Sequence, residues 1–273
     1  PDVNIAVYDT GYADAPFTVN VKMKDFAFAR LDITSGPVPL RVVREYVKMD
    51  DIGYDVWAYV KDGFLKMKRL TYEKDHPFTA NLELSRMTGT YNGNELTDIS
   101  GNLDVEESKG TISEGKGYFK ASKFYDLKGT INFGKKPWVR LMGKYTVDLT
   151  HIPYFTDLKE VTISKGWADG AIELDSRNEK GLAFGGSGKI NNAAVEWKGQ
   201  SFTVNGPFQL SGQELLFSTI TISGNDTSLA LNGRWGPKGF TCFVKGYADS
   251  RLIGTITGNT VRISGKVQFD SQV

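Results

Sequence analysis

The sequence predicts an all-β protein: an elongated, strongly curved antiparallel sheet of the β-taco (groove) or solenoid-like kind, with one short helix. Apolar and polar residues alternate along most of the chain, which is typical of strands with one apolar face. A strand-like phrase recurs at widely separated places. The 273 residues include 30 glycines, 12% aromatic residues and only nine prolines, a composition that suits many strands joined by tight turns.

The recurring phrase reads aliphatic-Ser-Gly-x-aliphatic-x-apolar. It occurs at Ile99–Val105 and Ile263–Phe269, with a looser copy at Val204–Leu210. In each copy the glycine and the apolar residues occupy alternate positions, so they point to one face of a strand. A chain that repeats such a phrase is expected to repeat a β module.

A second pair of phrases extends the repetition. Asp126–Gly134 follows Gly101 much as Ser228–Gly236 follows Gly206, and the spacing between the copies is nearly constant. We therefore expect one continuous β-repeat segment over residues 1–273, with approximate repeats at 95–200 and 200–273 and a less well defined part at 1–60. In repeat architectures each unit buries its apolar face by stacking on its neighbours.

Individual strands are predicted wherever the alternation is clear. In chain order these are the stretches around Phe17/Val19/Val21, Phe78/Ala80/Leu82/Leu84, 99–105, 126–134, 138–142, Ile172/Leu174, 202–210, Leu216/Ile220/Ile222, 228–236, 240–244, Leu252/Ile256 and 263–269. Turns are expected between them at Asp62-Gly63, Asn92-Gly93, Lys109-Gly110, Lys180-Gly181 and Gly224-Asn225.

One segment departs from this pattern. Pro39–Met49 places Leu40, Val43 and Val47 at helical spacing, which predicts a short amphipathic helix. The favoured role is packing across an end or a side of the sheet. The alternative is a helix at a membrane surface, because Arg41, Arg44 and Lys48 decorate its polar side.

Two Asn-Gly pairs, Asn205-Gly206 and Asn232-Gly233, need a separate interpretation. Asn-Gly usually marks a tight hairpin turn. Here the apolar alternation continues through both glycines, so we predict that they lie inside strands. Glycines at equivalent places would then mark a bend repeated along a curved sheet.

Composition excludes several classes of function. The formal charge is +1, from 33 basic and 32 acidic residues, and provides no basic footprint for nucleic acid. The single cysteine, Cys242, cannot form an internal disulfide and is predicted to be a small buried apolar residue. We find no apolar stretch of membrane-spanning length and no signal-peptide pattern.

Catalytic and cofactor signals are weak. His76 and His151 lie beside turns or prolines, and no metal-ligand spacing is present, so no metal or other cofactor is expected. The glycine-rich stretch Phe184–Ile190 lacks phosphate-loop spacing and is interpreted as a bend in a strand. Glu173 and Asp175 are two residues apart on one predicted strand. A glycosidase pair could have that spacing, but a solvated strand face explains it as well.

The chain resembles the AsmA-like proteins of Gram-negative bacteria, which include TamB and YhdP. The resemblance rests on Gly188–Trp197, the strand around Gly206, Ile220–Gly224 and Ser228–Gly233. An earlier counterpart runs from Leu65–Leu70 through Gly101 and Gly129 to Asp148-Leu149, so residues 60–273 are covered. The motifs are degenerate hydrophobic-glycine patterns.

The resemblance implies a non-enzymatic module that binds phospholipid acyl chains in an apolar β-groove and helps to move lipids between inner and outer membranes. It further implies a periplasmic location within a longer, inner-membrane-anchored protein, with inner- and outer-membrane envelope proteins as candidate partners. The candidate groove lining is Leu103, Val105, Leu127, Ile131, Phe133, Phe208, Leu210, Leu229, Leu231, Trp235, Val267 and Phe269.

Two other functions remain open from the sequence. A structural or adhesive β-repeat module would use the same apolar residues as a self-covered core, since alternation identifies the apolar face but not what covers it. A carbohydrate-active β enzyme would need Glu173 or Asp175 in a cleft beside exposed aromatic rings.

Overall fold

The computed structural model describes residues 2–7, 17–24, 27–46, 60–91, 93–134, 136–154, 161–177, 183–224, 226–237, 239–250 and 266–272. The predicted all-β class is confirmed: the described residues form open, curved antiparallel sheet with one short helix. The chain divides into two units, and the division falls within two strands. Unit 1 comprises residues 1–143 and 175–179, and unit 2 comprises residues 144–174 and 180–273.

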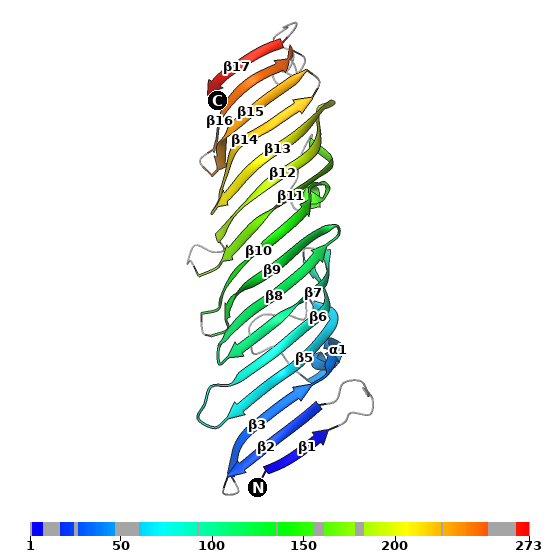
Figure 1. Cartoon of the computed structure of the whole chain (residues 1–273), viewed down its shortest axis with the longest axis vertical. Coiled ribbons are helices and arrows are strands. Elements are labelled where there is room, and N and C mark those ends of the chain that lie inside the picture. Colours follow the sequence, from blue (N-terminus) through cyan, green and yellow to red (C-terminus); the bar gives the residue numbers. More distant parts are fainter. Residues whose placement is uncertain are drawn as a thin grey trace. The chain divides into compact units, whose positions relative to one another are not determined.

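In unit 1 the strands follow one another through the sheet in chain order, and the strands that pair with a known register are antiparallel (Figure 1). They are β1 (Asp2–Val7), β2 (Phe17–Lys24), β3 (Ala27–Ser35), β4 (Pro37–Pro39), β5 (Val60–Glu73), β6 (Thr79–Tyr91), β7 (Asn94–Glu106), β8 (Lys109–Phe119), β9 (Ser122–Asn132) and most of β10 (Trp138–Asp148). Both β3 and the short β4 pair with β5.

Unit 2 is built in the same way. After the end of β10 and a 3-10 helix, η3 (Leu149–Tyr154), come β11 (Val161–Asp175), β12 (Ala183–Trp197), β13 (Gln200–Ser211), β14 (Glu214–Gly224), β15 (Thr227–Gly236), β16 (Gly239–Asp249) and β17 (Lys266–Gln272). From β12 to β17 each strand is antiparallel to the next in chain order. Asp175, the last residue of β11, belongs to unit 1.

The repeated phrases fall on corresponding strands. Gly101 lies on β7 and Gly206 on β13, while Gly129 lies on β9 and Gly233 on β15, so the members of each pair are six strands apart in chain order. The two units are compact bodies and not sequence repeats, so the repeat boundaries at residues 95 and 200 stay a prediction. Ile263–Gly265, the start of the third copy, lies outside the described residues.

The predicted helix is confirmed in a shorter form. Helix α1 (Leu40–Tyr46) contacts β4 and β5, and buries Leu40 and Val42. Val42 packs with Val38, Phe17 and Val43 in a small apolar cluster. The helix therefore has the favoured packing role, whereas contact with a membrane remains a prediction. Val47 and Lys48 lie outside the described residues.

Two of the predicted turns are wrong. Asp62-Gly63 lies inside β5, where the pairing with β6 shifts register on both sides of Asp62 and Gly63 has a φ of +140°. The Asp62 carboxylate accepts a hydrogen bond from the Gly63 N–H at 2.8 Å, so this dipeptide forms a bulge and not a chain reversal. Lys109-Gly110 begins β8, and the turn lies just before it at Glu107-Ser108. Lys180-Gly181 is outside the described residues.

Candidate functional site

The register of unit 1 places the predicted lining residues on one face of its sheet. Leu103 of β7 pairs with Leu82 of β6 and Ile112 of β8, so an apolar row crosses three strands. A second row runs through Val105, Gly110 and Ile131. Leu127 and Phe133 share the face of Ile131, because they are separated from it by even numbers of residues on β9 and its continuation. We call this the apolar face of unit 1.

Unit 2 has an equivalent apolar face. Its rows join Leu210 to Leu215 and Trp235, and Phe208 to Phe217 and Gly233. Two further rows run through Ile220 and Leu231, and through Ile222 and Leu229. All the predicted lining residues with described side chains in unit 2 therefore share a face. Val267 and Phe269 lie on β17, whose apolar side chains are outside the described set.

The apolar faces are not packed away like the interior of a globular protein. None of the ten lining side chains that the structure describes is buried. Eight are half-buried, and two are exposed: Phe133 is 43% and Trp235 60% accessible. Buried apolar side chains form small local clusters instead, such as Phe202 and Ala248 with Trp197, Ile222 and Leu229 around them. Each unit thus presents registered apolar rows that its own described residues leave partly uncovered.

The Asn-Gly pairs lie inside strands, as predicted, and the structure shows what they do. Where β12 bulges against β13, the Asn205 side-chain oxygen accepts a hydrogen bond from the N–H of Asn192 at 2.7 Å. Where β14 bulges against β15, the Asn232 oxygen accepts from the N–H of Thr219, also at 2.7 Å. Asn192 and Thr219 both have a positive φ, of 48° and 55°. Each asparagine therefore stabilises a left-handed bulge residue on the neighbouring strand.

The glycine of each pair lets the neighbouring backbone approach closely. A Cβ at Gly206, whose φ is +141°, would lie 2.7 Å from the Thr219 carbonyl oxygen. A Cβ at Gly233 would lie 2.2 Å from the Thr241 carbonyl oxygen and 3.0 Å from the Phe217 ring. These distances are shorter than carbon–oxygen contacts allow, so only glycine fits the observed backbone.

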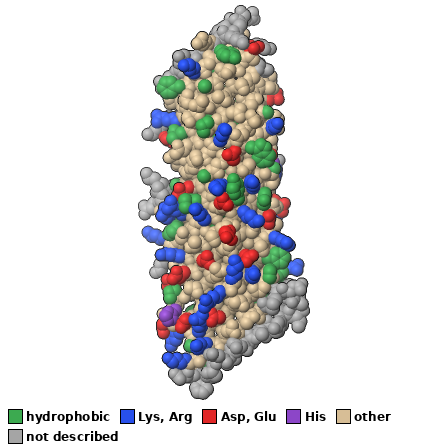
Figure 2. Space-filling model, viewed as in Figure 1, with side chains coloured by type: hydrophobic (Ala, Val, Ile, Leu, Met, Phe, Trp, Pro, Cys, Tyr) green, Lys and Arg blue, Asp and Glu red, His purple; other side chains and the backbone are tan. Residues whose placement is uncertain are grey.

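The opposite face of unit 1 is polar, and Lys and Arg side chains interleave with Asp and Glu over β5–β9 (Figure 2). Lys68 Nζ lies 3.3 Å from the Glu83 carboxylate and donates to the Asn102 side-chain oxygen at 2.8 Å. The Asn102 amide in turn donates to Glu114 at 2.7 Å. A chain of alternating donors and acceptors therefore crosses four strands, from β5 to β8.

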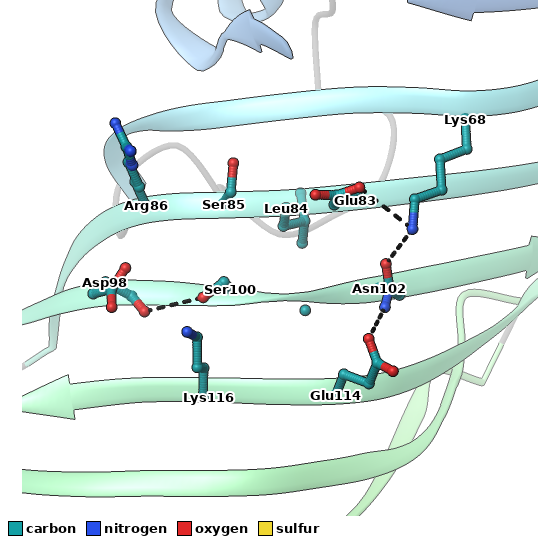
Figure 3. A pocket seen from close by; sticks show the side chains of 11 residues that line it. Lys68, Glu83, Leu84, Ser85, Arg86, Asp98, Ser100, Asn102, Glu114 and Lys116 are labelled. Carbon is teal, nitrogen blue, oxygen red and sulfur yellow. Dashed lines mark hydrogen bonds and ion pairs between the residues drawn. The ribbon is translucent and has the colours of Figure 1, made fainter. Parts of the chain in front are cut away.

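The residues of this hydrogen-bonded row also line a polar pocket of about 450 Å³ (Figure 3). It is lined by Lys68, Glu83, Leu84, Ser85, Arg86, Asp98, Ser100, Gly101, Asn102, Glu114 and Lys116. Arg86, Asp98 and Glu114 have a positive φ, so the pocket lies where the strands bulge. The pattern of sequence alternation gave no sign of it, because the pocket depends on register shifts between strands.

Asp175 is held as an ionised carboxylate. The Arg177 guanidinium donates to both of its oxygens, with Nε at 2.9 Å and 3.0 Å, and Arg140 Nε lies 3.9 Å away. These contacts, the hydrogen bonds of Arg177 first, lower the pKa of Asp175 to about 2. A carboxyl group with this pKa is ionised at neutral pH and is unsuited to donate a proton as a general acid. Glu173 belongs to unit 2.

The remaining candidate residues have structural settings. Cys242 is 1% exposed, and its burial raises the pKa of the thiol, which confirms the interpretation as a small buried residue. His76 lies exposed in the turn after β5, and His151 lies half-buried in η3. Phe184–Ile190 is part of strand β12, as predicted. Within the described ranges, no group of three metal-ligating side chains is present and no helix is long and apolar enough to cross a membrane.

Comparison with known proteins adds no relative: no family model, curated protein or solved structure matches the chain.

Proposed function

We propose that this chain is a non-enzymatic module that binds phospholipid acyl chains along the apolar face of its open sheet. The observation that carries the proposal is that the lining residues are aligned by strand register into apolar rows and yet stay partly exposed. A sheet with one apolar face must cover it with another layer or with a ligand. An acyl chain supplies such a cover, and each buried methylene contributes about 0.8 kcal/mol.

Side chains from neighbouring strands fill gaps on these faces. In unit 1 the Leu103 and Phe133 side chains lie over Gly110, where a Cβ would meet each of them at 3.0 Å. In unit 2 the Phe208 ring and the Tyr145 hydroxyl lie over Gly188. Burial of Tyr145 raises its pKa to about 12, so this hydroxyl stays neutral and adds no charge to the face. Apolar side chains placed in successive rows in this way favour a long, flexible, apolar ligand.

The resemblance of the sequence to AsmA-like proteins gives the proposal its biological setting. On that basis the ligand is a phospholipid, the compartment is the periplasm, and the chain is part of a longer protein that helps lipids to move between inner and outer membranes. Inner- and outer-membrane envelope proteins are then its expected partners. The ligand class, the compartment and the partners rest on the resemblance, whereas acyl-chain binding is supported by the geometry of the apolar faces.

Fluorescence quenching tests the proposal directly, because unit 2 has an exposed tryptophan on each face. Trp235 lies on the apolar face. Trp167 is 40% exposed and lies on the other face. Asp169, two residues further along β11, points to the same side as Trp167 and accepts a hydrogen bond there from Asn191 at 2.5 Å. The adjacent residue, Gly166, faces the opposite side and lies close to Ala193. A phospholipid with brominated acyl chains, delivered as monomers from cyclodextrin, should quench Trp235 and spare Trp167.

The matched variants are Trp235→Phe and Trp167→Phe, each checked for folding by circular dichroism. We expect Trp235→Phe to remove a large part of the lipid-dependent quenching and Trp167→Phe to leave it unchanged. Equal losses in the two variants, or no quenching of the unmodified protein, would show that acyl chains do not bind the apolar face of unit 2.

A further inference from the structure

The apolar face of unit 2 differs between the two ends of its strands. Turns alternate between these ends, so the β12–β13 turn and the β15–β16 turn lie at opposite ends (Figure 1). Trp235, next to the last residue of β15, is 60% exposed. Phe184, the second residue of β12, is 43% exposed at the same end, and it shares the apolar face because Gly186 pairs with Leu210. We call Phe184 and Trp235 the aromatic rim.

The opposite end of the same face is filled by packed side chains. Phe202 of β13 and Ala248 of β16 are 8% and 1% exposed, and Trp197, Ile222 and Leu229 pack against them. Trp197 is the last residue of β12, beside the β12–β13 turn. We call this cluster the closed end. Water reaches the rings of the aromatic rim, whereas the two central side chains of the closed end are buried.

Unit 1 shows the same difference on its own apolar face. Phe28 and Tyr72 are 39% and 47% exposed, and their rings stack with centroids 5.8 Å apart near the β2–β3 and β5–β6 turns. Register places Tyr72 on the apolar face. Phe133, just after β9, is exposed near a turn at that same end of the strands. At the other end Phe119, the last residue of β8, is 3% exposed. Exposed rings opposite a buried end are thus present in both units.

The distance between the two ends of unit 2 is sufficient for an acyl chain. Leu229 packs on the closed end, and Trp235 lies six residues further along the same face of β15, or about 20 Å along the strand. The acyl chains of one leaflet occupy half of the roughly 30 Å hydrocarbon core of a bilayer, so a chain of that size fits between the two ends.

The polarity of the two ends gives such a chain a direction. A charged headgroup would be unfavourable at the closed end, because burial of an unpaired charge is costly. Tryptophan rings favour boundaries with one apolar and one wet side, such as the interface of a membrane. Trp235 is at a boundary of this kind, since apolar rows lie on one side of it and solvent on the other.

We propose that a phospholipid lies along the strands of unit 2, with its headgroup at the aromatic rim and the methyl ends of its acyl chains at the closed end. This inference rests on the proposed function, because it assigns a direction to a lipid bound on the apolar face. The ligand is accordingly an amphiphile with one polar end. It enters and leaves over the aromatic rim, since side chains of the protein fill the closed end.

Amide NMR of the full chain with spin-labelled lipids tests this direction without any substitution. One phosphatidylcholine carries a nitroxide on its headgroup, and a second carries it near the methyl end of one acyl chain. Each is delivered as monomers from cyclodextrin, and the nitroxide broadens only the signals of nearby amides. We expect the headgroup label to broaden the signals of Phe184 and Trp235 more than those of Phe202 and Ala248. The methyl-end label should do the reverse.

The outcomes separate this inference from the proposed function. If neither label broadens signals of the apolar face, acyl chains do not bind there, and the proposed function fails together with the inference. If both labels broaden the same signals equally, or the headgroup label acts mainly at Phe202 and Ala248, lipid binds the apolar face but the assigned direction is wrong.

Trp235→Ala tests the contribution of the aromatic rim. Loss of this ring should weaken the binding of unlabelled phosphatidylcholine severalfold, because the ring contacts both the acyl chains and the headgroup. The matched control is Trp167→Ala, which removes an exposed tryptophan from the other face and should leave the apparent Kd unchanged. Circular dichroism verifies that both variants are folded. Equal Kd values in the two variants would show that the rim does not hold the lipid.

Discussion

Substitution of Gly233 by alanine tests the role assigned to the Asn-Gly pairs. The added Cβ would lie 2.2 Å from the Thr241 carbonyl oxygen and 2.9 Å from the Cys242 Cα. Because even close carbon–oxygen contacts require about 3.3 Å, β16 would have to move away from β15 by about 1 Å. Both obstacles are backbone atoms of the adjacent strand, so rotation of a side chain cannot relieve the clash.

The expected cost follows from this displacement. Overpacking of a closely fitted site destabilises proteins by roughly 1–3 kcal/mol. Replacing glycine by alanine also restricts the unfolded chain, which returns about 0.4–1 kcal/mol. We therefore expect Gly233→Ala to lower the free energy of unfolding of unit 2 by about 1–2 kcal/mol.

Gly185→Ala is the matched control. Gly185 lies on β12 of the same unit, and the nearest atom to its added Cβ would be the Glu173 Cβ at 3.9 Å, an ordinary contact. This variant should be as stable as the unmodified protein or slightly more stable.

Equilibrium urea unfolding, followed by circular dichroism and tryptophan fluorescence, provides the measurement. Because the chain has two units, hydrogen exchange of the β15 and β16 amides gives a local readout in which Gly233→Ala should accelerate exchange around the Gly233↔Cys242 pair. If Gly233→Ala proves as stable as Gly185→Ala, with unchanged exchange, the close approach of β15 and β16 does not require glycine.

Three further predictions concern single side chains. Asn232→Ala removes the acceptor of the Thr219 N–H and should lower the free energy of unfolding in urea by about 1 kcal/mol. An unchanged unfolding midpoint would mean that this hydrogen bond contributes nothing to stability. Hydrogen bonds from Arg30 lower the pKa of Asp32 to about 2, so the stabilisation by the ionised carboxylate is present above the unfolded pKa near 4 and is lost as pH falls through 2. After discounting for solvent screening, Asp32→Asn should lower the free energy of unfolding by about 1 kcal/mol at pH 7 and flatten its dependence on acid pH. A variant whose stability follows pH in parallel with the unmodified protein would refute this assignment. Cys242 should react with a thiol reagent at neutral pH far more slowly in the folded than in the urea-unfolded protein, since burial raises its pKa; equal rates would contradict its buried position.

Much of the local structure could be predicted because it depends on neighbouring residues. The two-residue period of Leu103 and Val105, or of Leu229 and Leu231, identifies strands and assigns their side chains to one face. The same continuity through Gly206 and Gly233 distinguished strand glycines from hairpin turns. Helix α1 was recognisable from the spacing of Leu40 and Val43, although it begins and ends inside the expected range.

The errors and omissions arise where one strand meets another. Asp62-Gly63 has the composition of a turn, but pairing with β6 makes it a bulge. The pKa of Asp175 is lowered to about 2 because Arg177 and Arg140 converge on its carboxylate. The polar pocket exists because shifts in register between β6, β7 and β8 bring Arg86, Asp98 and Lys116 together.

The sequence alone thus determined which residues form strands and which side of each strand is apolar, because side-chain direction follows from local backbone geometry. Only the tertiary structure decided the register, the bulges and the degree to which the apolar rows are covered. These depend on contacts between residues that are distant in sequence, such as Asn232 with Thr219 or Lys68 with Asn102. A strand shifted by two residues against its neighbour would keep the same side chains on the apolar face, so the alternating pattern does not encode the register, the bulges or the cover of the apolar rows.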